Sequence, residues 1–188
     1  MLFDVEKLIG FAAYVMKKLE RSSMQYIKLI KLMYLSDRES VKLYDRTISN
    51  DDLYSMDNGP ILSRLLNLIH QDCNSELQCL WNACFSVSNY DIEIHPDKAY
   101  LYIDRLSRAE MTIVDKVVAE FGNRDVWDLI DNYLHHLPEW KNPHGSSIPI
   151  RLEDLMRAFD RSEEEIAAVK EENEAYKEEL SVCGGVSS

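Results

Sequence analysis

Residues 22–61, SSMQYIKLIKLMYLSDRESVKLYDRTISNDDLYSMDNGPI, contain the longest strongly apolar helical pattern of the chain. A capping box marks its start, because Ser22 can accept a hydrogen bond from the amide of Gln25 while the Gln25 side chain reaches back. The stretch ends in Asn58-Gly59-Pro60, a turn whose proline is favoured at the first position of a helix. It therefore predicts a long helix over residues 24–45, followed by a polar, turn-rich segment.

One face of this predicted helix is apolar, and a single carboxylate lies in its middle. At 100° per residue, the face is formed by Tyr26, Leu29, Ile30, Met33, Tyr34, Val41 and Tyr44. Asp37 points into the centre of this face. A buried carboxylate costs several kcal/mol unless it is paired or hydrogen-bonded. We therefore expect Asp37 to be structural, bound to a backbone amide, a tyrosine hydroxyl or a basic side chain; a catalytic role is the less favoured alternative.

The opposite side of the same helix carries a basic stripe, which consists of Lys28, Lys31, Arg38 and Lys42. Most stripes of this kind are only the solvated face of a helix. The alternative is a surface that binds a partner.

The composition is that of an acidic globular protein. The 188 residues carry a net charge of −12 and include 46% hydrophobic and 29% charged residues. This charge disfavours nonspecific binding to nucleic acids and to anionic membranes, and it suits a basic protein partner. No apolar run is long enough for a membrane span, and acidic residues interrupt the first ten positions where a signal peptide would be apolar. The four cysteines form no CxxC pair, so we expect reduced thiols, no zinc site and a cytoplasmic location.

The rest of the chain predicts a mainly α (α+β) fold, a compact helical domain with a small β-hairpin or three-stranded element and an acidic C-terminal helix. Asp4 can cap a first helix that ends near residue 20, and Ser107 with Glu110 forms a capping box for a helix that ends at Gly122. Further helices are expected over residues 60–70, 124–137, 152–159 and 162–180. Short extended segments are expected over 53–56, 84–87 and 148–150, a loop over 71–78, and a hairpin between 91–94 and 100–103.

The sequence divides into a domain over residues 1–160, an acidic helical extension over 161–182 and a flexible tail over 183–188. Ser162 with Glu165 forms the capping box of the extension. The extension carries a narrow seam at helical spacing, formed by Ile166, Val169, Asn173, Tyr176 and Leu180. This seam either packs on its own domain or pairs with another chain, including a second copy.

Motifs for catalysis are not found in the sequence. It has no phosphate-binding glycine loop, no nucleophile elbow and no HExxH, so we expect no catalytic residues and no cofactor. His135 and His136 are adjacent, and neighbouring helical side chains point about 100° apart, which argues against a shared metal. His135 is expected to be structural, and Trp127 and Trp140 are expected to be core and lid residues rather than a binding cage.

Two blocks of sequence carry a resemblance to a known family. The first is KLIKLMYLSDR at residues 28–38, followed by Asn58-Gly59-Pro60-Ile61. The second is LSRAE at 106–110, then VVAEFG at 117–122, then Leu134-His135-His136 and Glu139-Trp140. In order and spacing these blocks resemble the Panacea family, also called the SocA-like antitoxin domain, over about residues 4–160. Residues 51–57 differ from the aromatic and small residues common in the family at this point.

The resemblance implies a bacterial or phage antitoxin that neutralises a toxin encoded by an adjacent gene through protein contact. Two alternatives are an adaptor that delivers the toxin to a AAA+ protease, and a phage or mobile-element regulatory protein that binds a host factor. We expect no membrane partner, and nucleic acid is disfavoured by the charge. The expected partner-binding residues are Lys28, Lys31, Tyr34, Arg38, Lys42, Asn58, Gly59 and Pro60. The expected structural residues are Asp37, Trp127, His135 and Trp140.

Overall fold

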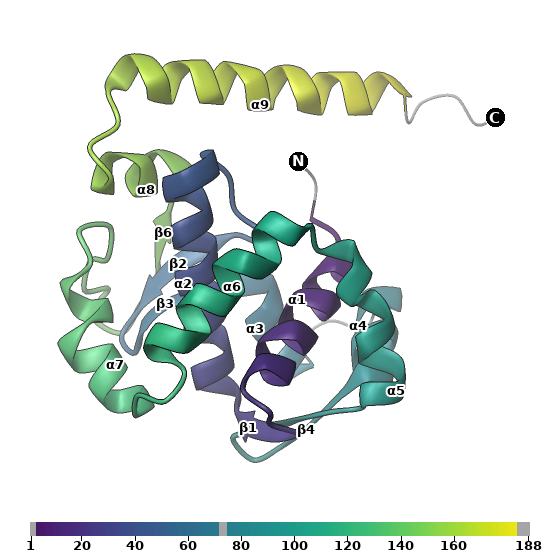
Figure 1. The fold of residues 1–188 in the computed structure, drawn as a ribbon. Helices are drawn as coiled ribbons and strands as arrows, with labels where there is room; N and C mark the ends of the chain where they lie inside the picture. The colour runs from purple at the N-terminus through teal and green to yellow at the C-terminus, as the bar shows by residue number, and fades with distance from the viewer. Residues whose placement is uncertain (1–2, 72–74, 184–188) are drawn as a thin grey trace.

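Helix α2 (Tyr26–Tyr44) runs through the middle of the molecule, and other elements cover it on several sides (Figure 1). The structure is a computed structural model that describes residues 3–71 and 75–183. Helices α1 (Val5–Lys18), α6 (Arg108–Phe121) and α8 (Leu152–Ala158) all contact α2, as does strand β3 (Gly59–Leu62). The fold is mainly α (α+β), as the sequence predicts, and among the described residues it has two three-stranded antiparallel sheets.

The predicted capping box at the start of α2 is wrong. Ser23–Gln25 forms strand β1, which pairs with β5 (Asp91–Ile94), and the Gln25 side chain makes no capping hydrogen bond. The amide of Tyr26 instead donates to the carbonyl of Tyr90 at 3.0 Å. Pairing with β5 fixes these residues in an extended conformation, so the helix begins only at Tyr26.

The predicted hairpin between residues 91–94 and 100–103 is also wrong. Strand β5 pairs with β4 (Phe85–Ser88), close to the expected strand at 84–87, and the sheet order is β1-β5-β4. After β5, Pro96 opens a short helix α5 (Pro96–Ala99), which continues as the 3₁₀ helix η1 (Tyr100–Arg105). The alternation of apolar residues over four positions does not distinguish a strand from a helical turn, and a proline at a helix N-terminus favours the turn.

The second sheet has the strand order β3-β2-β6 and includes two of the extended segments predicted from the sequence. Strands β2 (Leu53–Met56) and β6 (Ile148–Ile150) lie where they were expected. Pro60 does not start a helix, because Gly59, at φ +82°, turns the chain back and places Pro60 opposite Ser55 in β3. Helix α3 (Ser63–His70) follows this strand. Both outer strands contain a proline, which cannot donate to a further strand.

The middle and the end of the chain contain the remaining helices. Helix α4 (Glu76–Cys84) begins within the predicted loop at 71–78, and residues 72–74 of that loop lie outside the described part. The Ser107–Glu110 capping box of α6 is confirmed. Helix α7 (Val126–Asn132) is shorter than predicted, with Asp125 as its N-cap, and the 3₁₀ helix η2 (Leu134–His136) follows.

Helix α9 (Glu163–Cys183) forms the acidic extension and lies across one end of the domain (Figure 1). The predicted Ser162–Glu165 hydrogen bonds are present in both directions. On its seam Ile166 is buried, whereas Val169 and Asn173 are half-buried; the side chains of Tyr176 and Leu180 and the predicted tail at 184–188 lie outside the described part. Across the described residues, no helix is both long and apolar enough to span a membrane.

Candidate functional site

Asp37 holds the turn that follows α2. Its Oδ1 accepts hydrogen bonds from the amides of Ile48 at 2.7 Å and Ser49 at 2.9 Å, and its Oδ2 accepts from the Ser49 hydroxyl. Asp37 is fully buried, as the helical wheel predicts. Burial raises the pKa of this carboxyl to about 7, while the three hydrogen bonds act in the opposite direction. The partners are thus backbone amides and a serine hydroxyl rather than a tyrosine or a cation.

Lys31 lies inside the molecule, so its predicted exposure on a basic stripe is wrong. Its side chain is fully buried, and Nζ donates to the carbonyl oxygen of Pro60 at 2.8 Å. Burial lowers the pKa of this amine to about 7. The helical wheel gave the wrong exposure because it assumes that the protein covers only one side of the helix. Strand β3 and the region around Leu134 cover the opposite side of α2 as well. Lys31→Glu would therefore destabilise the fold, because it would bury a carboxylate beside the carbonyl oxygen of Pro60.

Glu139 joins two further side chains of α2. The Tyr34 hydroxyl donates to Glu139 Oε1 at 2.9 Å, and Arg38 Nε donates to the same oxygen at 2.7 Å. Tyr34 is fully buried and Glu139 nearly so, and burial next to this carboxylate raises the pKa of Tyr34 well above its usual value. The Arg38 guanidinium also stacks over Phe159, 4.4 Å from its ring centroid. A buried carboxylate is tolerated here because a charged and a neutral donor both reach it.

The segment around Glu139 is attached to the β2–β3 hairpin. The rings of His135 and Trp140 stack with centroids 4.2 Å apart. His135 Nε2 lies 3.0 Å from the carbonyl oxygen of Asp57, and Trp140 Nε1 donates to that of Met56 at 3.2 Å. These contacts suit the structural role expected for His135 and Trp140.

Trp127, expected in the core, is 51% exposed. Helix α7 buries its other apolar side chains, Val126, Leu129 and Ile130. Trp127 follows Val126 directly and points about 100° away from it, toward solvent. The expectation for this residue was therefore wrong.

The eight predicted partner-binding residues do not form one continuous surface. Lys42 and Asn58 are exposed, Lys28 and Arg38 are half-buried, and the other four, Lys31, Tyr34, Gly59 and Pro60, are buried. Lys28 donates to the carbonyl of Arg124, so it too is engaged within the chain. Side chains of α2 thus connect this helix to the turn at Ile48, to strand β3, to the turn at Arg124 and to the segment at Glu139.

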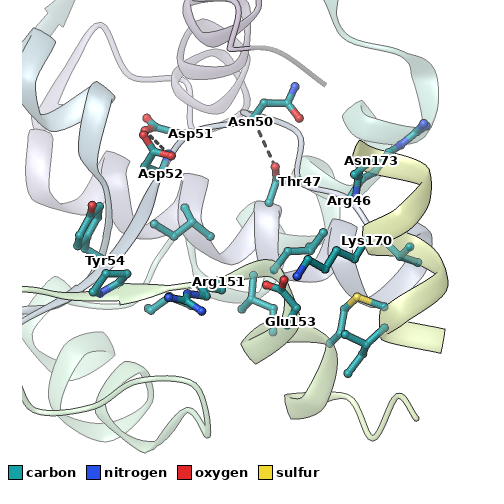
Figure 2. A pocket seen from close by; sticks show the side chains of 18 of the residues that line it. Arg46, Thr47, Asn50, Asp51, Asp52, Tyr54, Arg151, Glu153, Lys170 and Asn173 are labelled. Atoms are coloured by element: carbon teal, nitrogen blue, oxygen red, sulfur yellow. Dashed lines mark hydrogen bonds between the residues drawn. The ribbon is translucent and has the colours of Figure 1, made fainter. Parts of the chain in front are cut away.

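A groove of about 440 Å³ lies between β2, β6, α8 and α9 (Figure 2). Its apolar lining is Leu53, Pro149, Ile150, Leu152, Leu155, Met156, Ile166 and Val169. Its polar lining includes Asp51, whose carboxylate accepts from the amides of Arg64 and Leu65 at the start of α3, at 2.8 and 2.9 Å. Burial raises the pKa of Asp51 to about 6. Sequence reasoning missed this groove, because its walls come from segments more than 100 residues apart.

Within residues 3–71 and 75–183, no group of three or more His, Cys, Asp or Glu side chains is placed to hold a metal ion. Cys79 and Cys84 are free thiols, and burial raises the pKa of Cys84.

Most of the residues that make these polar contacts with α2 lie in the part of the chain that matches one protein-family model. Residues 29–141 match the family model described as "Antitoxin SocA-like, Panacea domain", which is more than half of the chain. The chain belongs to the SocA-like antitoxin (Panacea) family. No curated protein sequence and no solved structure matches it. The matched residues include Lys31, Asp37 and Glu139, whereas α8 and α9 lie beyond them.

Proposed function

We propose that this protein is an antitoxin that neutralises a cognate protein toxin, encoded by an adjacent gene, through direct binding. The observation that carries the proposal is the match of residues 29–141 to the SocA-like antitoxin family. The net charge of −12 further supports a basic partner, since complementary charge speeds association and favours the correct partner. The proposal requires no catalytic step, cofactor or metal.

We place the toxin contact on the exposed part of the predicted surface. Lys42 at the end of α2 and Asn58 at the tip of the β2–β3 hairpin can reach a partner without unfolding the domain. Lys31 supports the hairpin from beneath, through Pro60, and Arg38 supports the segment at Glu139. In this proposal the buried residues fix the shape of the surface and the exposed residues touch the toxin.

The adaptor role is the second candidate, and α9 is the observation that favours it. This helix lies outside the family match and exposes most of its described side chains, so it could contact a AAA+ protease while the domain holds the toxin. The adaptor requires the protease for neutralisation, whereas direct neutralisation does not.

Co-expression with the adjacent gene tests the proposed function. The gene should stop growth when it is induced alone, and co-expression of this protein should restore growth. A harmless neighbour, or a toxic one that this protein leaves lethal, would overturn the proposal. Lys42→Glu with Asn58→Arg should weaken rescue while the melting temperature stays near that of the wild type.

A further inference from the structure

The groove between β2, β6, α8 and α9 has apolar side chains that the rest of the chain covers only in part. Leu155, Met156 and Ile166 are buried at its base. Leu152 on α8 and Val169 on α9 also line the groove, and both are half-buried. A volume of about 440 Å³ is enough for several apolar side chains, since pockets of roughly 300–1,000 Å³ enclose whole small ligands.

Helix α9 forms one wall of the groove but is attached mainly at its beginning. Arg161 pairs with Asp45 at 3.1 Å just before the helix, and Arg157 pairs with Glu163 at 2.7 Å at its first residue. Ile166 is the one fully buried side chain between Glu163 and residue 175. A helix that is polar almost all round gains little from packing, so few apolar contacts hold α9 to the domain, and Val169 is left half-buried beside the groove.

The charges around the groove favour a cationic occupant. Its lining contains four carboxylates (Asp51, Asp52, Glu153 and Glu174) and three cations (Arg46, Arg151 and Lys170). Internal contacts engage several of these groups: Asp51 binds backbone amides, Asp52 pairs with Arg64, and Lys170 pairs with Glu174. Lys170 and Glu153 point toward each other across the groove (Figure 2). The lining thus carries one carboxylate more than it has cations, and residues 151–175, which include α8 and the first half of α9, carry nine carboxylates and four cations, so the potential around the groove is negative.

The same charges argue against a second copy of the chain in the groove. Another copy would bring a net charge of −12 and the same glutamate-rich helix. Like charges facing each other across an interface oppose association.

We propose that this groove binds a basic amphipathic segment of the toxin, with its apolar side chains between Leu152 and Val169 and its cations facing Asp52, Glu153 and Glu174 of the lining. The binding mode is that of an amphipathic helix in an apolar groove. This inference rests on the proposed function, because it adds a second contact region for the same partner and states the chemistry of the segment that fills it. It also gives α8 and α9 a role, although both lie beyond the family match.

The test measures binding of the purified product of the adjacent gene to groove variants of the full chain. Val169→Trp fills the groove, and Ala168→Trp adds the same side chain at an exposed neighbouring position of α9. We expect Val169→Trp to weaken binding at least tenfold and Ala168→Trp to leave it within twofold, with similar circular dichroism spectra for both. A second comparison tests the charges. The variant Asp52→Asn/Glu153→Gln/Glu174→Gln removes three carboxylates from the groove lining. Its control, Glu164→Gln/Glu171→Gln/Glu172→Gln, removes three carboxylates of α9 that lie outside the lining.

Wild-type binding should weaken with added salt, whereas the triple variant in the groove lining should bind less tightly at low salt and lose less affinity as salt is added, because it has fewer charges to screen. If the wild type neutralises the toxin and both members of each pair bind it equally, the groove inference is overturned and the proposed function stands. A switch from dimer to monomer in Val169→Trp would assign the groove to a second copy and would also overturn it. If the wild type neither binds nor neutralises the product, the proposed function fails, and this inference fails with it.

Discussion

Lys31 on α2 donates a 2.8 Å hydrogen bond to the carbonyl oxygen of Pro60 on β3, and both residues are buried. The helical pattern predicts that Lys31 is an exposed cation, whereas in the structure its amine is buried. The contact connects the central helix to the strand that follows the Asn58-Gly59 turn. Together with the contacts of His135 and Trp140, it holds the β2–β3 hairpin in place.

We expect Lys31→Met to remove a rise in stability that the wild type shows above neutral pH. The folded pKa of about 7 lies below the ordinary value of 10.5, so between these pH values the folded state binds fewer protons than the unfolded state. Stability from this group therefore increases as the pH rises from about 7 toward 10. Urea unfolding of both proteins at pH 6.5 to 9.5 measures the difference, in which the other titrating groups cancel. Parallel pH profiles would show that Lys31 is protonated throughout this range.

Asp37→Ala should lower the free energy of unfolding by about 3 kcal/mol, because it leaves the amides of Ile48 and Ser49 buried without an acceptor. The control is Asp104→Ala, at an exposed aspartate, which should change stability by less than about 0.5 kcal/mol. Thermal and urea unfolding measure both variants. Equal melting temperatures for the two would contradict the structural role of Asp37.

Glu139→Gln should loosen the segment that leads to β6. The glutamine keeps the size of the side chain but leaves the guanidinium of Arg38 half-buried without a carboxylate. Hydrogen exchange should become faster over residues 139–150 and stay unchanged in α1. Unchanged exchange in both regions would show that the Arg38–Glu139 pair does not hold this segment.

Gly10→Ala should destabilise the fold strongly, because a Cβ at this position of α1 would lie 2.0 Å from the carbonyl oxygen of Tyr102 in η1. The matched variant, Gly145→Ala, has no atom within 4 Å of the new Cβ and carries only the strain of φ +81°. That strain costs roughly 1–2 kcal/mol. We expect Gly10→Ala to melt well below Gly145→Ala, and the reverse order would contradict the close contact of α1 with η1.

Removal of residues 161–188 tests the predicted domain boundary. The truncated chain should fold and unfold cooperatively, with stability lowered by about 2 kcal/mol, because it loses the burial of Ile166 and the Arg161–Asp45 pair. Circular dichroism and urea unfolding check this. A truncated chain that does not fold would place α9 within the domain rather than outside it.

The sequence predicted helix ends correctly where contacts between neighbouring residues determine them. The Ser107–Glu110 capping box and the Asp4 cap depend on neighbouring residues, and both are present. The strands at 53–56 and 148–150 are present as well, although they pair with each other across the sequence. The errors arose where distant segments compete with local preference. Residues 23–25 are extended because they pair with β5, and Pro60 is in a strand because β2 lies beside it.

In the candidate site too, local sequence predicts a residue's environment only where its partners are close in sequence. The burial of Asp37 could be predicted, because its neighbours on the wheel are apolar, but its partners come from the following turn. The burial of Lys31 could not, because the covering strand and the Leu134 region are about 30 and 100 residues away in sequence. Glu139 carries no sequence signal that links it to Arg38, and only the tertiary structure brings them together.

Growth of a host that lacks its AAA+ proteases tests whether this protein neutralises the toxin by direct binding. The adjacent gene is induced with and without this protein, and the amount of toxin is measured by immunoblot. The account predicts that growth is restored while the amount of toxin stays the same. Persistent growth arrest with both proteins present at comparable levels would contradict it.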